Sequence, residues 1–89
     1  MAEHDIVISG NFDYQKITKS VDSVPNILIY EKPEDYPDKY VARVWDGITA
    51  TRLVALADTL EEIRKKIPAG MKPFLHGKFE DPCIVEVWI

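Results

Sequence analysis

The most reactive side chains of this sequence lie close together near its carboxyl end. His76, Asp81 and Cys83 fall within one short stretch that has the composition of a turn. A cysteine becomes nucleophilic when a neighbouring base or cation lowers the pKa of its thiol. A reversal of the chain between His76 and Cys83 would bring such a base to the thiol. Residues 76–83 therefore form one candidate reactive site, for a thiol-dependent enzyme or for a small ligand.

A structural role explains the same residues with fewer requirements. Cysteine packs well as a small apolar side chain, and a histidine needs placed partners before it can act in acid–base catalysis. The sequence has no phosphate-binding loop, dinucleotide fingerprint, zinc-protease helix motif or serine-hydrolase elbow. We therefore expect no catalytic residues, and the sequence favours a non-catalytic protein over an enzyme.

A dense group of carboxylates lies in EKPEDYPDKY, residues 31–40, between two segments that have the pattern of strands. Two prolines make this connection stiff and extended, and it is longer than most hairpin loops. Tyrosine is favoured at interfaces because it joins a large contact area to a polar tip, and carboxylates attract a basic partner. We predict a protein-contact surface formed by Glu34, Asp35, Tyr36 and Asp38, with Trp88 as a further contact residue.

Other interpretations of these residues stay open. Tyr36 can instead pack back onto the edge of the sheet, which leaves the acids to solvate a stiff connection. Trp45 and Trp88 can both be core residues, and we expect this of at least one of them. An exposed terminal strand would offer unpaired backbone groups to another chain. Self-association, as an isologous homodimer or as a structural subunit of a larger assembly, is therefore a further interpretation.

Composition and charge argue against several classes of function. The net charge is −4, whereas a protein that binds nucleic acid usually needs a basic face to replace the counterions on phosphate. The acids of residues 31–40 lack the spacing of a calcium loop. The single cysteine excludes an internal disulfide and a zinc site built from several thiolates. We expect neither a metal nor a cofactor, and another protein rather than nucleic acid as the partner.

The chain has the features of one cytoplasmic domain. Residues 1–10, MAEHDIVISG, lack the basic region and the long apolar run of a signal peptide. No segment approaches the roughly 20 apolar residues that a membrane span requires, and low cysteine usage fits a reducing compartment. The 89 residues suit a single domain, with the core in residues 26–89 and a less regular segment in residues 1–25.

The elements that must position these side chains are mostly strands. Residues 26–31 are apolar on both faces, which predicts a central strand. Alternating patterns predict further strands at 39–46 and 48–57, joined by a turn at Asp46-Gly47. A helix that begins within residues 53–57 competes with the second of these. Two more segments have strand patterns, the β-branched residues 83–89 and the shorter residues 72–79.

One helix is marked clearly, over residues 59–67. Asp58 and Thr59 each precede a glutamate by three residues, which is the pattern of a capping box. Three apolar side chains then recur on one face, so the helix must dock on a sheet; they are Leu60, Ile63 and Ile67.

These elements predict an α+β fold in the order β-β-β-α-β. About four mostly antiparallel strands form the sheet, and one main helix covers one face of it. The last strand returns beside a central one, through a right-handed crossover if the two are parallel. Residues 5–9 can add an amino-terminal strand, and residues 12–23 can form a short helix or an irregular turn.

Three segments resemble a family of short, uncharacterised bacterial proteins, some of which are associated with phage or mobile-element genes. The segments are DYPDKYVAR (35–43), DTLEEIRKKIPAGM (58–71) and DPCIVEVWI (81–89). The resemblance covers roughly residues 27–89. It implies a common fold and no activity.

The run ADTLEEI, residues 57–63, resembles the start of the helix in HicB-like antitoxin domains, which have a partial ribonuclease-H-like fold. That resemblance is one of architecture, and it implies a small protein that acts by binding another protein. The acidity of the chain, the absence of catalytic motifs, the stiff acidic connection and the terminal strand make a protein-interaction module or accessory factor the leading prediction.

Overall fold

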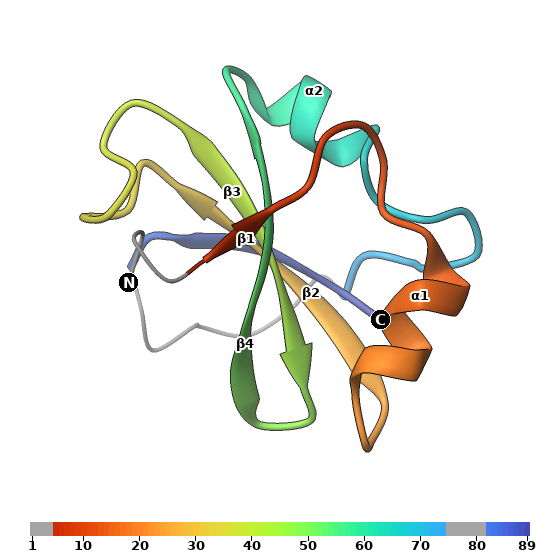
Figure 1. Ribbon diagram of the computed structural model, residues 1–89. Helices are drawn as coiled ribbons and strands as arrows, with labels where there is room; N and C mark the ends of the chain where they lie inside the picture. The colour runs from red at the N-terminus through yellow and green to blue at the C-terminus, as the bar shows by residue number, and fades with distance from the viewer. Residues whose placement is uncertain (1–4, 75–81) are drawn as a thin grey trace.

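The computed structural model describes residues 5–74 and 82–89. Within this part of the chain, a strongly twisted sheet of five strands carries two short helices, both to the right of the sheet in Figure 1. Across the sheet the strand order is β1-β4-β3-β2-β5. Along the chain the elements are β1 (Ile6–Val7), α1 (Tyr14–Ser20), β2 (Pro25–Glu31), β3 (Tyr40–Asp46), β4 (Thr49–Ala57), α2 (Leu60–Arg64) and β5 (Ile84–Trp88).

The centre of the sheet is the antiparallel set β2, β3 and β4. These are the strands predicted by the apolar residues 26–31 and by the alternating patterns of residues 39–46 and 48–57. The predicted turn between β3 and β4 is confirmed, and Gly47 takes a φ of +60° there. The Asp46 carboxylate braces this turn, because it accepts the backbone N–H groups of Asp22 and Ser23 at 3.1 and 2.9 Å. These hydrogen bonds lower the pKa of Asp46, and they attach the chain before β2 to the end of β3.

The core lies between the sheet and the two helices. Asp13 caps α1 by accepting the N–H of Gln15 at 2.9 Å. Thr59 caps α2, since its hydroxyl accepts the N–H of Glu62 and donates to the carboxylate of that residue, each at 3.1 Å. The helices and the chain that flanks them bury one set of apolar side chains against the sheet: Phe12, Ile17, Ile63, Ile67 and Met71 on Ile27, Ile29, Ala42, Val44, Ala55 and Ala57.

The two outer strands pair differently. β1 runs parallel to β4, with Ile6 opposite Leu53. β5 runs antiparallel to β2, so the last strand does lie beside a central one, without the parallel crossover that was considered. On its outer side, the carboxyl end of β5 is paired in turn, because Lys72 and Ile89 exchange backbone hydrogen bonds at 2.8 and 2.9 Å. Part of the terminal strand is therefore covered within the chain.

Two expectations need correction, and one alternative is ruled out. The α+β class and the mostly antiparallel sheet are confirmed. The described chain has five strands and two helices where about four strands and one main helix were expected, because the optional strand within residues 5–9 and the optional short helix within residues 12–23 both form, as β1 and α1. The helix that competed for residues 53–57 does not form, because those residues complete β4. α2 ends at Arg64, earlier than residue 67, since Lys66 and Ile67 donate to carbonyls three residues back. Of the segment 72–79, residues 75–79 lie outside the described chain, and Pro73 bridges Trp88.

Apolar and charged side chains share the second face of the sheet. Val41, Arg43 and Trp45 alternate with the core positions of β3, so they point away from the helices. Val41 and Val54 are nonetheless almost fully buried on this side. In Figure 1 the connection between β2 and β3 lies on this side of the sheet, opposite the helices. No helix among the described residues has the length and hydropathy to cross a membrane.

Candidate functional site

The connection between β2 and β3 is folded into a compact, hydrogen-bonded loop. Lys32 donates its backbone N–H to the carbonyl of Lys39 at 2.9 Å, which closes the base of the loop. Inside it, Tyr36 donates to Pro33 at 3.0 Å and Lys39 donates to Tyr36 at 3.1 Å, so two tight turns follow each other. Lys32 has a φ of +47°, a conformation that costs a residue with a side chain free energy. The loop is therefore held in one shape by its own backbone.

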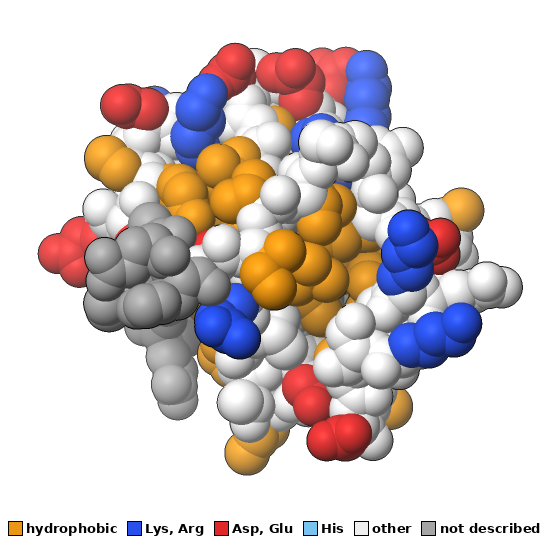
Figure 2. Space-filling model, in the orientation of Figure 1, with side chains coloured by type: hydrophobic (Ala, Val, Ile, Leu, Met, Phe, Trp, Pro, Cys, Tyr) orange, Lys and Arg blue, Asp and Glu red, His pale blue; other side chains and the backbone are white. Residues whose placement is uncertain are grey.

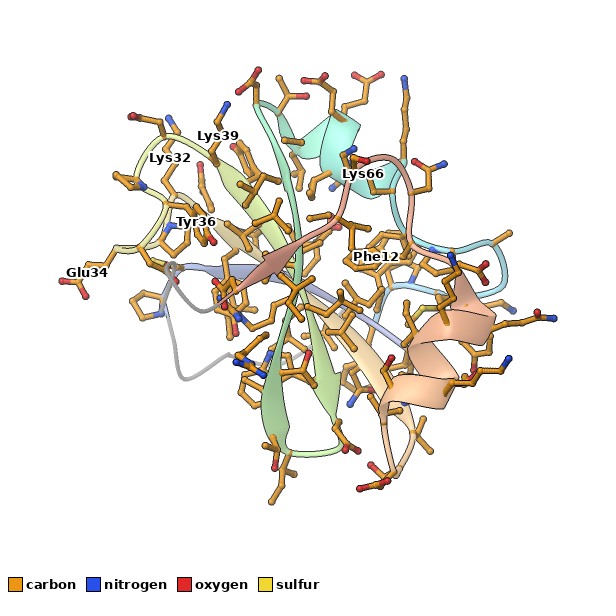
Figure 3. All side chains as sticks on the ribbon, in the orientation of Figure 1. Phe12, Lys32, Glu34, Tyr36, Lys39 and Lys66 are labelled. Atoms are coloured by element: carbon orange, nitrogen blue, oxygen red, sulfur yellow. The ribbon has the colours of Figure 1, made fainter. Side chains whose placement is uncertain are left out.

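Side-chain contacts attach this loop to the sheet. Figure 3 shows Tyr36 directed from the loop toward the strands, whereas Glu34 points outward. The Tyr36 hydroxyl donates to Asp5 Oδ2 at 3.0 Å. Asp35 Oδ2 lies 3.5 Å from a terminal nitrogen of Arg43. Tyr36 thus packs back onto the sheet, which is the alternative to a contact role that the sequence left open. Part of the acidic loop is paired inside the molecule.

Arg43 is the centre of this network. Its two terminal nitrogens donate to the two oxygens of Asp5, each at 2.9 Å, and one of them also donates to the Thr51 carbonyl at 2.8 Å. The Asp5 side chain is 1% exposed and that of Arg43 is 13% exposed. A charge pair removed from water in this way is stable only when both partners are well hydrogen bonded, and this geometry meets that condition.

The network shifts the ionisation of its members. The hydrogen bonds from Arg43 hold the pKa of the Asp5 carboxyl below its usual range despite burial, and Tyr36 contributes in the same direction. The hydrogen bond from Asp5 raises the pKa of the Arg43 guanidinium. Burial, followed by the hydrogen bond to Asp5, raises the pKa of the Tyr36 hydroxyl. At neutral pH the pair is therefore ionised and the tyrosine is protonated.

An open cavity of about 520 Å³ lies between this loop and the second face of the sheet. We call it the loop groove. Glu34 and Asp35 stand on the loop side, and Tyr30 and Val41 belong to the sheet. The Tyr30 hydroxyl accepts the indole N–H of Trp45 at 3.2 Å, which fixes the ring. The described residues that line the groove are Tyr30, Pro33, Glu34, Asp35, Val41, Arg43, Ala50 and Cys83.

Of the predicted contact residues, the structure brings Glu34 and Asp35 together in the groove. Tyr36 anchors the loop behind them, and Asp38 is exposed on the same loop. Trp88 lies elsewhere: it is opposite Ile27 on the face that the helices cover, and its indole N–H donates to Glu86 at 3.0 Å. A single contact surface therefore does not include both the loop and Trp88. Trp88 also packs against the core, as expected of at least one tryptophan.

The alternative reactive site is described only in part. His76 and Asp81 lie outside the described residues, so its geometry is not defined. Cys83 lines the loop groove, is partly buried, and accepts the N–H of Glu31 on its backbone carbonyl at 2.7 Å. Within residues 5–74 and 82–89, no three His, Cys, Asp or Glu side chains are grouped as metal ligands would be.

Sequence reasoning missed Asp5, Arg43 and Tyr30 as parts of the site. Arg43 gave a usable signal, since it stands between Val41 and Trp45 on one face of a strand. An arginine on such a face needs a buried acceptor. Nothing local indicated that the acceptor would be Asp5, far away in the sequence.

A second cavity, of about 240 Å³, lies on the helix side of the sheet next to β1. Ile6 and Leu53 line it together with Val21, which follows α1. Figure 2 shows hydrophobic side chains gathered at the centre of the face on which β1 runs. Ile6 and Val7 are 56% and 49% exposed.

Comparison with known proteins gives no family for the chain: no protein-family profile, no curated protein and no solved structure matches it.

Proposed function

We propose that this protein is a small non-catalytic interaction module or accessory factor that binds another protein through the loop groove. The observation that carries the proposal is a rigid acidic loop anchored over a partly apolar cavity. A binding site gains affinity when its groups are already held in place, because less conformational freedom is lost on association. The Asp5–Arg43 pair and the bond to Tyr36 provide that support.

The size and chemistry of the groove also support this function. A cavity of about 520 Å³ falls in the range of roughly 300–1,000 Å³ that is usual for pockets that bury a ligand. Its lining combines aromatic and aliphatic side chains with a few charged groups, as contact pockets do. Protein partners place one or two anchor side chains in pockets of this kind.

A capture experiment with a groove-filling variant tests the proposal. Ala50 is exposed and lines the groove, so Ala50→Trp places an indole there without altering the core. We expect the wild-type protein to retain a stoichiometric partner from a lysate of the source organism, and the variant to lose it. Exposed charge pairs are screened at about 1 M salt, so the complex should also weaken there. A partner retained equally by Ala50→Trp would contradict the proposal.

A small-molecule ligand is the second candidate, because Cys83 lines the same groove. A ligand that binds only the folded state raises the melting temperature in a saturable way. A thermal-shift panel of small molecules, run with wild-type protein and Ala50→Trp, separates this candidate from a protein partner. A saturable shift in the wild type that disappears in the variant would favour the ligand.

A further inference from the structure

We propose that the loop groove receives the side chain of an arginine from an extended segment of the partner protein. This inference rests on the proposed function, which it makes more specific by naming the chemistry of the partner. Three features of the groove point to this side chain: its charge, its apolar floor and the geometry of its two acids.

The charge of the groove is negative. Arg43 is its one cation among the described residues, and Asp5 already binds both terminal nitrogens of that guanidinium. Asp35 keeps one long contact to Arg43 at 3.5 Å and Glu34 is exposed on the loop, so the lining carries one more negative charge than positive. A cation entering the groove meets Glu34, Asp35 and a single guanidinium that Asp5 already neutralises, so like-charge repulsion from Arg43 is weak.

The apolar floor selects among cations. Tyr30 and Pro33 are partly exposed and offer aromatic and aliphatic surface beside the acids. Long basic side chains pack their methylene stems on such surface while the charged head reaches polar groups. An arginine also stacks its guanidinium on an aromatic ring more readily than a lysine places its ammonium there. A hydrated metal ion or a compact ammonium has no apolar stem and would gain less from this part of the groove.

The two acids suit a guanidinium in particular. Glu34 and Asp35 are neighbours in the loop, and Asp35 is 32% exposed at its side chain while it stays 3.5 Å from Arg43. A carboxylate has room for further donors after one long contact. A planar guanidinium can donate two parallel hydrogen bonds to a carboxylate and a further one to its neighbour. The loop backbone is closed between Lys32 and Lys39 and Asp35 contacts Arg43, so the Asp35 carboxylate is held near its place before binding. The exposed Glu34 side chain points outward and has to turn toward the bound guanidinium.

Selection from a displayed library of random heptapeptides provides the probe. The immobilised wild-type protein is the target, and each selected peptide is afterwards tested on the Ala50→Trp variant. Selected sequences are then made as acetylated and amidated peptides, and each is also made with citrulline in place of its arginine. Binding is measured by fluorescence anisotropy, and the site by the NMR signal of the Trp45 indole N–H, which is bonded to Tyr30.

We expect the selected peptides to share an arginine and to shift the Trp45 signal. Replacement of this arginine by citrulline, which keeps the shape and removes the charge, should weaken binding by about tenfold, since a hydrogen bond to a charged group contributes roughly 1.5 kcal/mol or more. The protein variant Glu34→Gln/Asp35→Asn should lose a similar factor. Asp22→Asn/Glu61→Gln is the matched control: it removes the same charge from exposed residues outside the groove, and it should bind as the wild type does.

The other outcomes separate this inference from the proposed function. Peptides that need an open groove but show no preference for arginine over citrulline would overturn the inference and leave the proposed function standing. Peptides that bind Ala50→Trp equally well, or no selected peptide at all, would overturn both. If free agmatine shifted the Trp45 signal with the same affinity as the best peptide, the groove would be a small-amine site, and the partner-arginine inference would be wrong.

Discussion

The carboxylate of Asp5 faces the guanidinium of Arg43, and each carboxylate oxygen accepts a hydrogen bond from one terminal nitrogen at 2.9 Å. Asp5 precedes the edge strand β1, and Arg43 lies in the central strand β3. The Tyr36 hydroxyl donates to the same carboxylate. One buried ion pair therefore joins the start of the described chain, the sheet and the acidic loop.

Replacing one partner of this pair should lower the free energy of unfolding more than replacing both. Arg43→Met leaves the buried Asp5 carboxylate without its main donor, and we expect a loss of about 3 kcal/mol in the free energy of unfolding. The double variant Asp5→Asn/Arg43→Met leaves no unpaired charge and should recover part of that loss. Urea unfolding of the wild type, both single variants and the double variant measures the coupling. Additive losses would show that the pair does not act as a unit.

The protein should lose stability in acid through Asp5 and Glu86. Burial alone would raise the pKa of Glu86, but hydrogen bonds from Arg64 and Trp88 outweigh it and lower that pKa from its ordinary 4.5, while the pKa of Asp5 falls below 3.8. A depressed folded pKa contributes stability above the unfolded value and loses it as the pH falls through the folded value. Urea unfolding is measured at about pH 7, 5, 4 and 3, which span this window. The free energy of unfolding should begin to decline near the unfolded pKa values.

The matched comparison is Asp5→Asn/Glu86→Gln. This variant should be less stable at neutral pH and should show a flatter dependence on pH below the unfolded pKa values. A wild-type stability that stayed constant or rose on acidification would contradict the assignment of both carboxylates.

The turn at Gly47 should tolerate no side chain. A Cβ atom there would lie 2.7 Å from Ser23 Oγ, and the φ of +60° is strained for a residue with a side chain. Ser23 cannot move aside freely, because its hydroxyl donates to Asp46 at 2.8 Å. We expect Gly47→Ala to lower stability by about 2 kcal/mol. Gly10→Ala is the control, since Gly10 also has a positive φ but no atom within 4 Å; equal losses would deny any role for the Ser23 contact.

Trp88 should matter for stability and not for binding at the loop groove. Trp88→Phe keeps an aromatic ring in the core and removes the hydrogen bond to Glu86, which should cost about 1 kcal/mol. Because Trp88 lies on the helix-covered face, the affinity of a groove-binding peptide should not change. If this variant lost affinity while circular dichroism showed an intact fold, Trp88 would be a contact residue, as the sequence analysis predicted.

An occupant of the loop groove should protect Cys83 from alkylation. The residue lines the groove, so a bound peptide covers it. At a peptide concentration of about ten times Kd, only the small unbound fraction of the protein can react, and the rate with iodoacetamide should fall about tenfold by mass action. Mass spectrometry of the intact protein follows the reaction, and urea-unfolded protein is the control in which the peptide should have no effect. An unchanged rate in native protein would place the peptide elsewhere.

The sequence by itself determined the features that depend on neighbours along the chain. Apolar residues on both faces predicted β2, alternation predicted β3 and β4, and the β-branched residues 83–89 predicted β5. Asp46-Gly47 predicted the hairpin turn, and the spacing of Thr59 and Glu62 predicted the cap of α2. Two prolines and four acids marked the loop as stiff and acidic. Each of these features arises within a few residues, where backbone geometry and hydrogen-bond reach limit the choices.

Only the tertiary structure decided which of these features meet. The parallel pairing of β1 with β4 places Asp5 beside Arg43. Tyr36 then donates to Asp5, which holds the loop against the sheet with Glu34 and Asp35 at the groove. Partners this far apart leave no periodic trace in the sequence. Their meeting depends on the order of strands across the sheet and on which face the helices cover, since the burial of a charge is favourable only where the complete fold supplies its counterpart.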